Sequence, residues 1–139
     1  MKSSSLLLSL LLLAACSSTP LRPVAFSAPE GFSAQEVEVA ILDALSDSTG
    51  QGGRKGEWSF DGKQPGVAFA RFRYDYFTMR AAVRYTGTDI TLEVLESHGL
   101  DQKSTSIHSQ AYIWLDGLEA RIKQRFGRVA SGHAKLSEN

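Results

Sequence analysis

The chain has 139 residues, of which 22% are charged, and its 15 Lys and Arg balance 15 Asp and Glu, so the formal net charge is zero. This balance gives no basis for a nucleic-acid partner or for a polybasic membrane patch, and we expect neither. The length favours one domain of roughly 100 residues. The single cysteine, Cys16, excludes an internal disulfide, so a hydrophobic core must hold the fold.

The first sixteen residues are typical of a secretion signal. Lys2 supplies a positive start, and residues 6–15 form an almost unbroken apolar run. This run is too short for a membrane-spanning helix, which needs roughly 20 apolar residues, and it has the length of a signal-peptide core. It ends in Leu13-Ala14-Ala15-Cys16, which resembles the lipobox of bacterial lipoproteins at every position. The resemblance implies that residues 1–15 are a signal peptide and that lipid is attached to the Cys16 thiol.

The same resemblance predicts where the protein resides. One acyl chain anchors only marginally, with burial contributing about 0.8 kcal/mol per CH₂, whereas two or three chains hold a protein on a membrane. Ser17 follows the cysteine in place of an Asp, which in enteric-type sorting implies transport to the outer membrane. We therefore expect a domain anchored to the bacterial outer membrane and facing the periplasm. The alternative is that Cys16 is an incidental cysteine beside a conventional cleavage site.

Residues 16–32 contain three of the four prolines and show little periodicity. This composition predicts an irregular, lipidated tether. A helix is expected from Ser33, because residues 33–36 form a capping box and Phe32 with Val37 fits a hydrophobic staple. The glycine-rich residues 50–56 lack the spacing of a phosphate-binding loop and are expected to form a flexible loop.

Residues 58–95 show the period-two alternation of strands. Apolar positions share a face at 58 and 60, at 68–72, at 77–85 and at 90–94, and turns are expected at Asp61-Gly62, at Pro65-Gly66 and at Gly87. Such strands, each with one polar face, predict an antiparallel meander with one face solvated.

The last predicted element is a long amphipathic helix. Its apolar stripe consists of Ile107, Ala111, Leu115, Leu118, Ile122 and Phe126. Gly127 is a good residue to end the helix, and residues 128–139 are expected to be a flexible tail. The predicted fold class is α+β. It is a two-layer sandwich within residues 33–127, in which two helices cover one face of an antiparallel three- or four-stranded sheet.

Several local features resemble a family of small Gram-negative bacterial lipoproteins of unknown function. They are Trp58, Pro65-Gly66-Val67-Ala68, the strand 81–85, the exit 97–100 and the Ile-His-x-x-x-Tyr-x-Trp-Leu helix 107–115. The resemblance spans residues 56–122 and implies location and fold, with no assigned activity. The chain departs from the family where Ala111 and Tyr112 occupy places that hold Tyr and Asn.

Two histidines are the main candidates for chemistry. His98 ends the predicted sheet and His108 opens the last helix, so the intervening loop could bring them together with Asp101 or Ser97 as a metal or general-base site. They lack a defining ligand spacing, and His108 also fits a capping or packing role. No Gly-x-Ser-x-Gly motif is present. We expect no metal, no other cofactor and no catalytic residue.

Four arginines form the candidate binding surface, because Arg71, Arg73, Arg80 and Arg84 project from the polar face of adjacent strands. They could dock an acidic partner, a lipid headgroup or a glycan. The alternative is a solvated face that Glu93 and Glu57 balance. Trp58 and Trp114 fit apolar faces, so core packing is favoured for both over ligand stacking.

These observations favour a membrane-anchored envelope lipoprotein that acts as a noncatalytic binding or assembly module for an envelope protein partner. The alternative is a small ligand-binding or metal-binding protein, or a hydrolase, that uses His98 or His108. The first is favoured because a two-layer domain of this size leaves little volume for a pocket once its core is filled.

Overall fold

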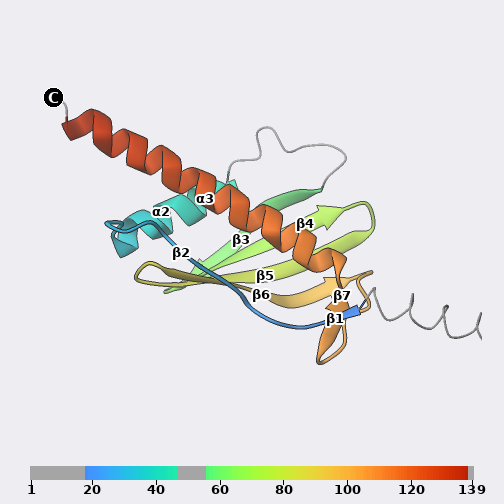
Figure 1. The fold of residues 1–139 in the computed structure, drawn as a ribbon. Helices are drawn as coiled ribbons and strands as arrows, with labels where there is room; N and C mark the ends of the chain where they lie inside the picture. Colours follow the sequence, from blue (N-terminus) through green and yellow to red (C-terminus); the bar gives the residue numbers. More distant parts are fainter. Residues whose placement is uncertain (1–17, 47–55, 138–139) are drawn as a thin grey trace, which may run out of the picture.

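A computed structural model describes residues 18–46 and 56–137 of the chain. The expected signal peptide 1–15, the expected lipidation site Cys16 and most of the glycine-rich loop lie outside these residues. The described elements are β1 (Ser18–Pro20), β2 (Val24–Ser27), α2 (Ala34–Ser46), β3 (Glu57–Gln64), β4 (Val67–Tyr74), β5 (Phe77–Thr86), β6 (Asp89–His98), β7 (Ser106–His108) and α3 (Gln110–Ser137) (Figure 1).

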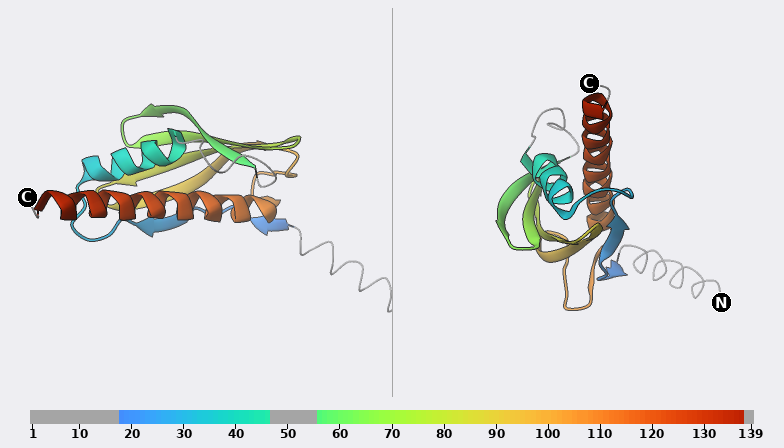
Figure 2. Two further views of the ribbon diagram at one scale, coloured as in Figure 1. Left: turned by 90° about the horizontal axis from the view of Figure 1, so that it is seen from above. Right: turned by 90° about the vertical axis from the view of Figure 1, so that its left-hand side faces the viewer.

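The fold is α+β, as expected, with two helices against one face of an antiparallel sheet (Figure 2). The sheet has five strands in the order β2-β6-β5-β4-β3, whereas three or four were expected. The fifth strand, β2, comes from the segment expected to be a tether. Val24 and Phe26 alternate toward the core as partners of Leu92 and Ile90, and burial of these two apolar side chains holds the segment in the sheet.

The irregular tether predicted for residues 16–32 is also wrong at its beginning. β1 pairs with β7 in a separate two-stranded ribbon, with Ser18 opposite His108. The Tyr112 hydroxyl fixes the chain after β1, because it accepts a hydrogen bond from the Arg22 N–H at 2.7 Å and contacts the Pro20 carbonyl oxygen at 3.2 Å. The chain is therefore attached to the domain from Ser18 onward.

The start of α2 is confirmed. The Ser33 hydroxyl accepts a hydrogen bond from the Glu36 N–H at 3.1 Å, which is the first half of a capping box. Phe32 packs edge-on against Phe126 of α3, with ring centroids 5.4 Å apart. This contact joins the beginning of α2 to the middle of α3.

The expected end of the second helix at Gly127 is wrong, because α3 continues to Ser137. Gly127 does not adopt the positive φ that ends many helices, and a glycine inside a helix costs only about 1 kcal/mol relative to alanine. The Ser131 hydroxyl donates a hydrogen bond to the Gly127 carbonyl one turn earlier, at 2.9 Å. Residues 128–137 are therefore helical and not an irregular tail.

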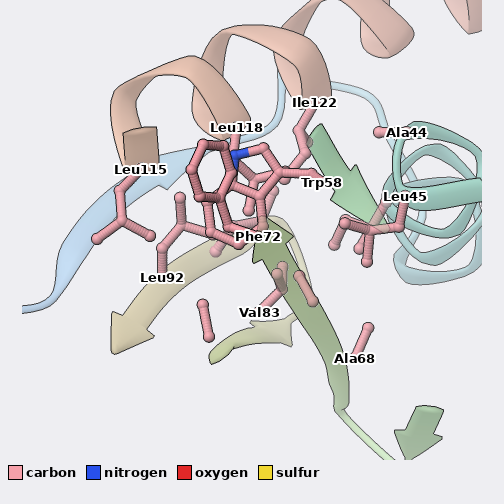
Figure 3. Close-up of a cluster of buried hydrophobic side chains, with 14 of the residues drawn as sticks. Ala44, Leu45, Trp58, Ala68, Phe72, Val83, Leu92, Leu115, Leu118 and Ile122 are labelled. Carbon is pink, nitrogen blue, oxygen red and sulfur yellow. The ribbon is translucent and has the colours of Figure 1, made fainter. Parts of the chain in front are cut away.

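The core lies between the sheet and the two helices (Figure 3). Leu115, Leu118 and Ile122 of α3 are completely buried, as their helical spacing predicts. Trp58 reaches them from β3 and is 6% exposed. Its packing role is the one expected from the sequence.

The turn expected at Asp61-Gly62 is instead a bulge within β3. The pairing register with β4 shifts between Phe60 and Lys63, and Gly62 adopts a φ of 99° that favours glycine. A bulge re-aims the side chains beside it. Asp61 consequently contacts arginines of the neighbouring strands, while the chain turns only at residues 65–66.

Candidate functional site

An open hollow of about 720 Å³ lies between the first turns of α3 and the end of the sheet where β4 meets β5. We call it the aromatic groove. It is lined by Gly56, Trp58, Phe72, Tyr74, Phe77, Gly99, Leu100, His108, Gln110, Ile113, Trp114, Gly117 and Arg121. Its volume falls within the range of small-molecule sites, about 300–1,000 Å³.

The groove exists because the two helices do not cover the sheet equally. α2 and the β4–β5 turn lie at opposite ends of the sheet, so among the elements that the structure describes only α3 covers the end near the turn (Figures 1 and 2). The large aromatic side chains there face one helix. The expectation that the core leaves little volume for a pocket is therefore wrong for this end of the domain.

Trp114 stands at the centre of the lining. Its ring stacks on Phe72 with centroids 4.4 Å apart, and Phe72 in turn lies 5.1 Å from Trp58. The Trp58 indole N–H donates a hydrogen bond to the Trp114 carbonyl oxygen at 3.1 Å. This chain of contacts joins β3, β4 and α3, so the three rings form one continuous apolar wall.

Two glycines with positive φ allow the chain to pass close to this wall. A Cβ at Gly56 would overlap the Phe72 ring, and a Cβ at Gly99 would lie 2.8 Å from the Phe77 ring. Gly117 differs, because a Cβ there meets nothing within 4 Å. A Cβ added at Gly117, which lines the groove, would therefore occupy open space.

The groove has an apolar rim that faces solvent. Tyr74 is 37% exposed, Tyr76 is 63% exposed and Ile113 is 62% exposed. Tyr76 lies against Phe77, with ring centroids 4.1 Å apart. Exposed apolar groups gathered beside a hollow are typical of a binding surface.

The two histidines do not meet. His98 lines a separate polar hollow of about 180 Å³, whereas His108 lines the aromatic groove. The His108 ring nitrogen Nδ1 accepts a hydrogen bond from the Gln110 N–H at 3.1 Å, which is the capping role weighed from the sequence. Ser97 donates to Gln102 at 2.7 Å. Within the described residues, no group of three or more His, Cys, Asp or Glu could hold a metal ion.

The four arginines do share the solvent face of the sheet, but most are paired. Asp61 contacts Arg80 at 2.9 Å and Arg71 at 3.3 Å, and Glu93 contacts Arg84 at 3.1 Å. The hydrogen bond from Arg80 is the main reason why the pKa of Asp61 lies below its ordinary value.

Two further carboxylates stand beside the arginines in the sheet. Glu57 is the register partner of Arg73, and Glu96 is the register partner of Arg80. With Asp61 and Glu93, these carboxylates equal the four arginines in number. This arrangement agrees with the alternative weighed from the sequence, a solvated face of balanced charge.

The sequence pattern missed the groove because both tryptophans were assigned to the core. Trp58 is indeed buried, and Trp114 is partly buried, yet both also line the hollow. The available signal was the concentration of aromatic residues in 72–77, together with Gly56 and Gly99 in the loops that pass close to them. An alternation pattern assigns side chains to a face of a sheet but does not show where a covering helix ends.

Comparisons of the chain with protein-family models, with curated proteins and with solved structures find no match. Among residues 18–46 and 56–137, no helix has the length and apolarity needed to cross a membrane.

Proposed function

We propose that this protein is a lipid-anchored envelope protein of Gram-negative bacteria whose domain binds an apolar ligand in the aromatic groove and performs no chemistry on it. The anchor is the acylated thiol of Cys16 in Leu13-Ala14-Ala15-Cys16, with the domain in the periplasm at the outer membrane. The likeness to small lipoproteins of unknown function agrees with this location.

The groove is the observation that carries the binding proposal. Trp58, Phe72 and Trp114 hold one another in place, so the apolar wall is formed before any ligand arrives. A preformed site avoids the entropic cost of ordering side chains on binding. The groove is therefore favoured over the arginine face, whose charges are compensated by neighbouring carboxylates.

Thiol protection in envelopes tests this function. Gly117→Cys places a thiol in the groove, and Gly127→Cys places one on the exposed part of the same helix, where an added Cβ also meets nothing within 4 Å. The parent chain should not react with a maleimide, because its single cysteine is acylated.

In intact envelopes, we expect the thiol at position 117 to react several-fold more slowly than the thiol at position 127, because a ligand fills the groove. Unfolding in detergent should make the two rates equal. Equal rates in the intact envelopes would show an empty groove and refute the binding proposal.

A further inference from the structure

We infer that the aromatic groove holds one acyl chain of a bilayer phospholipid and that the mouth of the groove faces the membrane. This inference rests on the proposed function, because it needs the lipid anchor on Cys16. It adds to that function the class of ligand and the orientation of the domain.

The position of β1 brings the anchor and the groove to the same end of the domain. Ser18 lies opposite His108 in the β1–β7 ribbon, and His108 lines the groove. Cys16 is two residues before Ser18 in the sequence. Because an extended chain spans at most about 3.6 Å per residue, two residues add at most about 7 Å of reach beyond Ser18.

The contacts that follow β1 keep this end of the domain from swinging away. The Leu21 N–H donates to the Thr105 carbonyl oxygen at 2.9 Å, and the Arg22 N–H donates to the Tyr112 hydroxyl at 2.7 Å. A long tether would allow any orientation on the membrane. A short connection, held against the domain from Ser18 onward, instead keeps the end that carries the groove close to the lipid surface.

The rim of the groove suits that surface. Tyr74, Tyr76 and Ile113 are exposed beside the groove. Tyrosine is enriched where a protein meets the membrane interface, because its ring is apolar and its hydroxyl can remain hydrated. These side chains would contact the interfacial layer while the groove opens between them.

An acyl chain suits the interior better than a peptide does. The wall includes the Trp58, Phe72, Phe77 and Trp114 rings, which offer an acyl chain apolar contact along its length. A peptide backbone in the same place would lose the hydration of its amide groups, which is costly without hydrogen-bond partners. Bilayer phospholipid also greatly outnumbers the acyl chains of the anchor, so mass action favours it as the occupant.

The chain supplies its own reporter for a test. Its two tryptophans are Trp58 and Trp114, and both line the groove. The full lipidated protein would be reconstituted into phosphatidylcholine vesicles that carry bromine on their acyl chains, because bromine quenches tryptophan fluorescence on contact. Unbrominated vesicles provide the reference, and vesicle flotation measures the anchor separately. We expect the protein to float with the vesicles and to lose most of its fluorescence in the brominated ones.

Two leucine variants separate an acyl chain in the groove from mere contact with the bilayer. Gly117→Leu places an apolar side chain in the groove and should restore part of the fluorescence, whereas Gly127→Leu makes the same change away from the groove and should leave the quenching unchanged. Thermal unfolding of both variants checks that each is folded.

Each other outcome overturns the inference. Flotation without quenching would mean that no bilayer chain reaches the groove. This outcome includes the case in which the unbrominated acyl chain of the anchor occupies the groove. The proposed lipid anchor would not be affected by it. Equal quenching in the parent and Gly117→Leu proteins would mean that only the rim touches lipid. Failure to float would refute the anchor, and with it the proposed function.

Discussion

The indole N–H of Trp58 in β3 donates a hydrogen bond to the main-chain oxygen of Trp114 in α3, 3.1 Å away. This bond joins the edge strand of the sheet to the helix that covers the groove. It also fixes the orientation of a ring that belongs both to the core and to the groove wall. Stability and the proposed ligand binding therefore depend on the same side chain.

Trp58→Phe should lower the free energy of unfolding by about 1–3 kcal/mol, because it removes a hydrogen bond and leaves a small cavity. Trp114→Phe is the matched control, since the acceptor of the bond is a main-chain atom that this change retains. Denaturant unfolding measures both variants. A larger loss of unfolding free energy for Trp114→Phe than for Trp58→Phe would show that the hydrogen bond contributes little to the packing of β3 against α3.

A polar cluster at the other end of the domain joins α2 to the sheet. Glu38 accepts hydrogen bonds from Lys63 at 2.6 Å and from the Tyr85 hydroxyl at 3.0 Å. The hydrogen bond from Lys63 is the main reason why the pKa of Glu38 lies below its ordinary value. Burial, and then the neighbouring Glu38, raise the pKa of Tyr85 from 10.0 to about 12.

The Tyr85 shift predicts how stability depends on pH. A raised folded-state pKa favours the neutral phenol. The contribution of Tyr85 to the free energy of unfolding is therefore complete below pH 10 and is lost as the pH rises toward 12. Tyr85→Phe should remove this part of the alkaline loss, which denaturant unfolding at a series of pH values measures. If the free energy of unfolding of the variant falls with alkaline pH as steeply as that of the parent, Tyr85 is not the cause of the fall.

The arginine face should show unequal contributions to stability. Arg84→Ala should change the free energy of unfolding by less than about 0.5 kcal/mol, because the side chain of Arg84 is 53% exposed and its ion pair is solvated. Arg80→Ala should cost about 1 kcal/mol, since its guanidinium also lies over the Phe69 ring, 4.4 Å from the centroid. Equal effects in denaturant unfolding would contradict this difference.

The sequence predicted those features of the fold that periodicity and helix capping determine. The start of α2 follows from the Ser33 capping box, and the buried positions of α3 follow from the spacing of Leu115, Leu118 and Ile122. β2 was missed because a short segment between prolines has too few residues to show alternation. Gly127 was misread as a helix end because its backbone conformation depends on the residues that continue the helix.

The candidate site was less predictable than the fold. The alternation of the strands placed the arginines on one face correctly, but their pairing with Asp61 depends on a bulge that the sequence suggested as a turn. The groove depends on how much of the sheet each helix covers. That relationship is set by packing between distant elements and leaves no local pattern in the chain.

Metabolic labelling with a fatty-acid probe tests the lipid anchor most directly. The parent protein should incorporate the probe and fractionate with membranes, whereas Cys16→Ser should lose the label, because the chain has no second cysteine to accept lipid. Labelling of the Cys16→Ser protein at the parental level would mean that lipid is attached elsewhere or that the anchor is not on this residue, and the membrane-facing orientation proposed for the groove would fall with it.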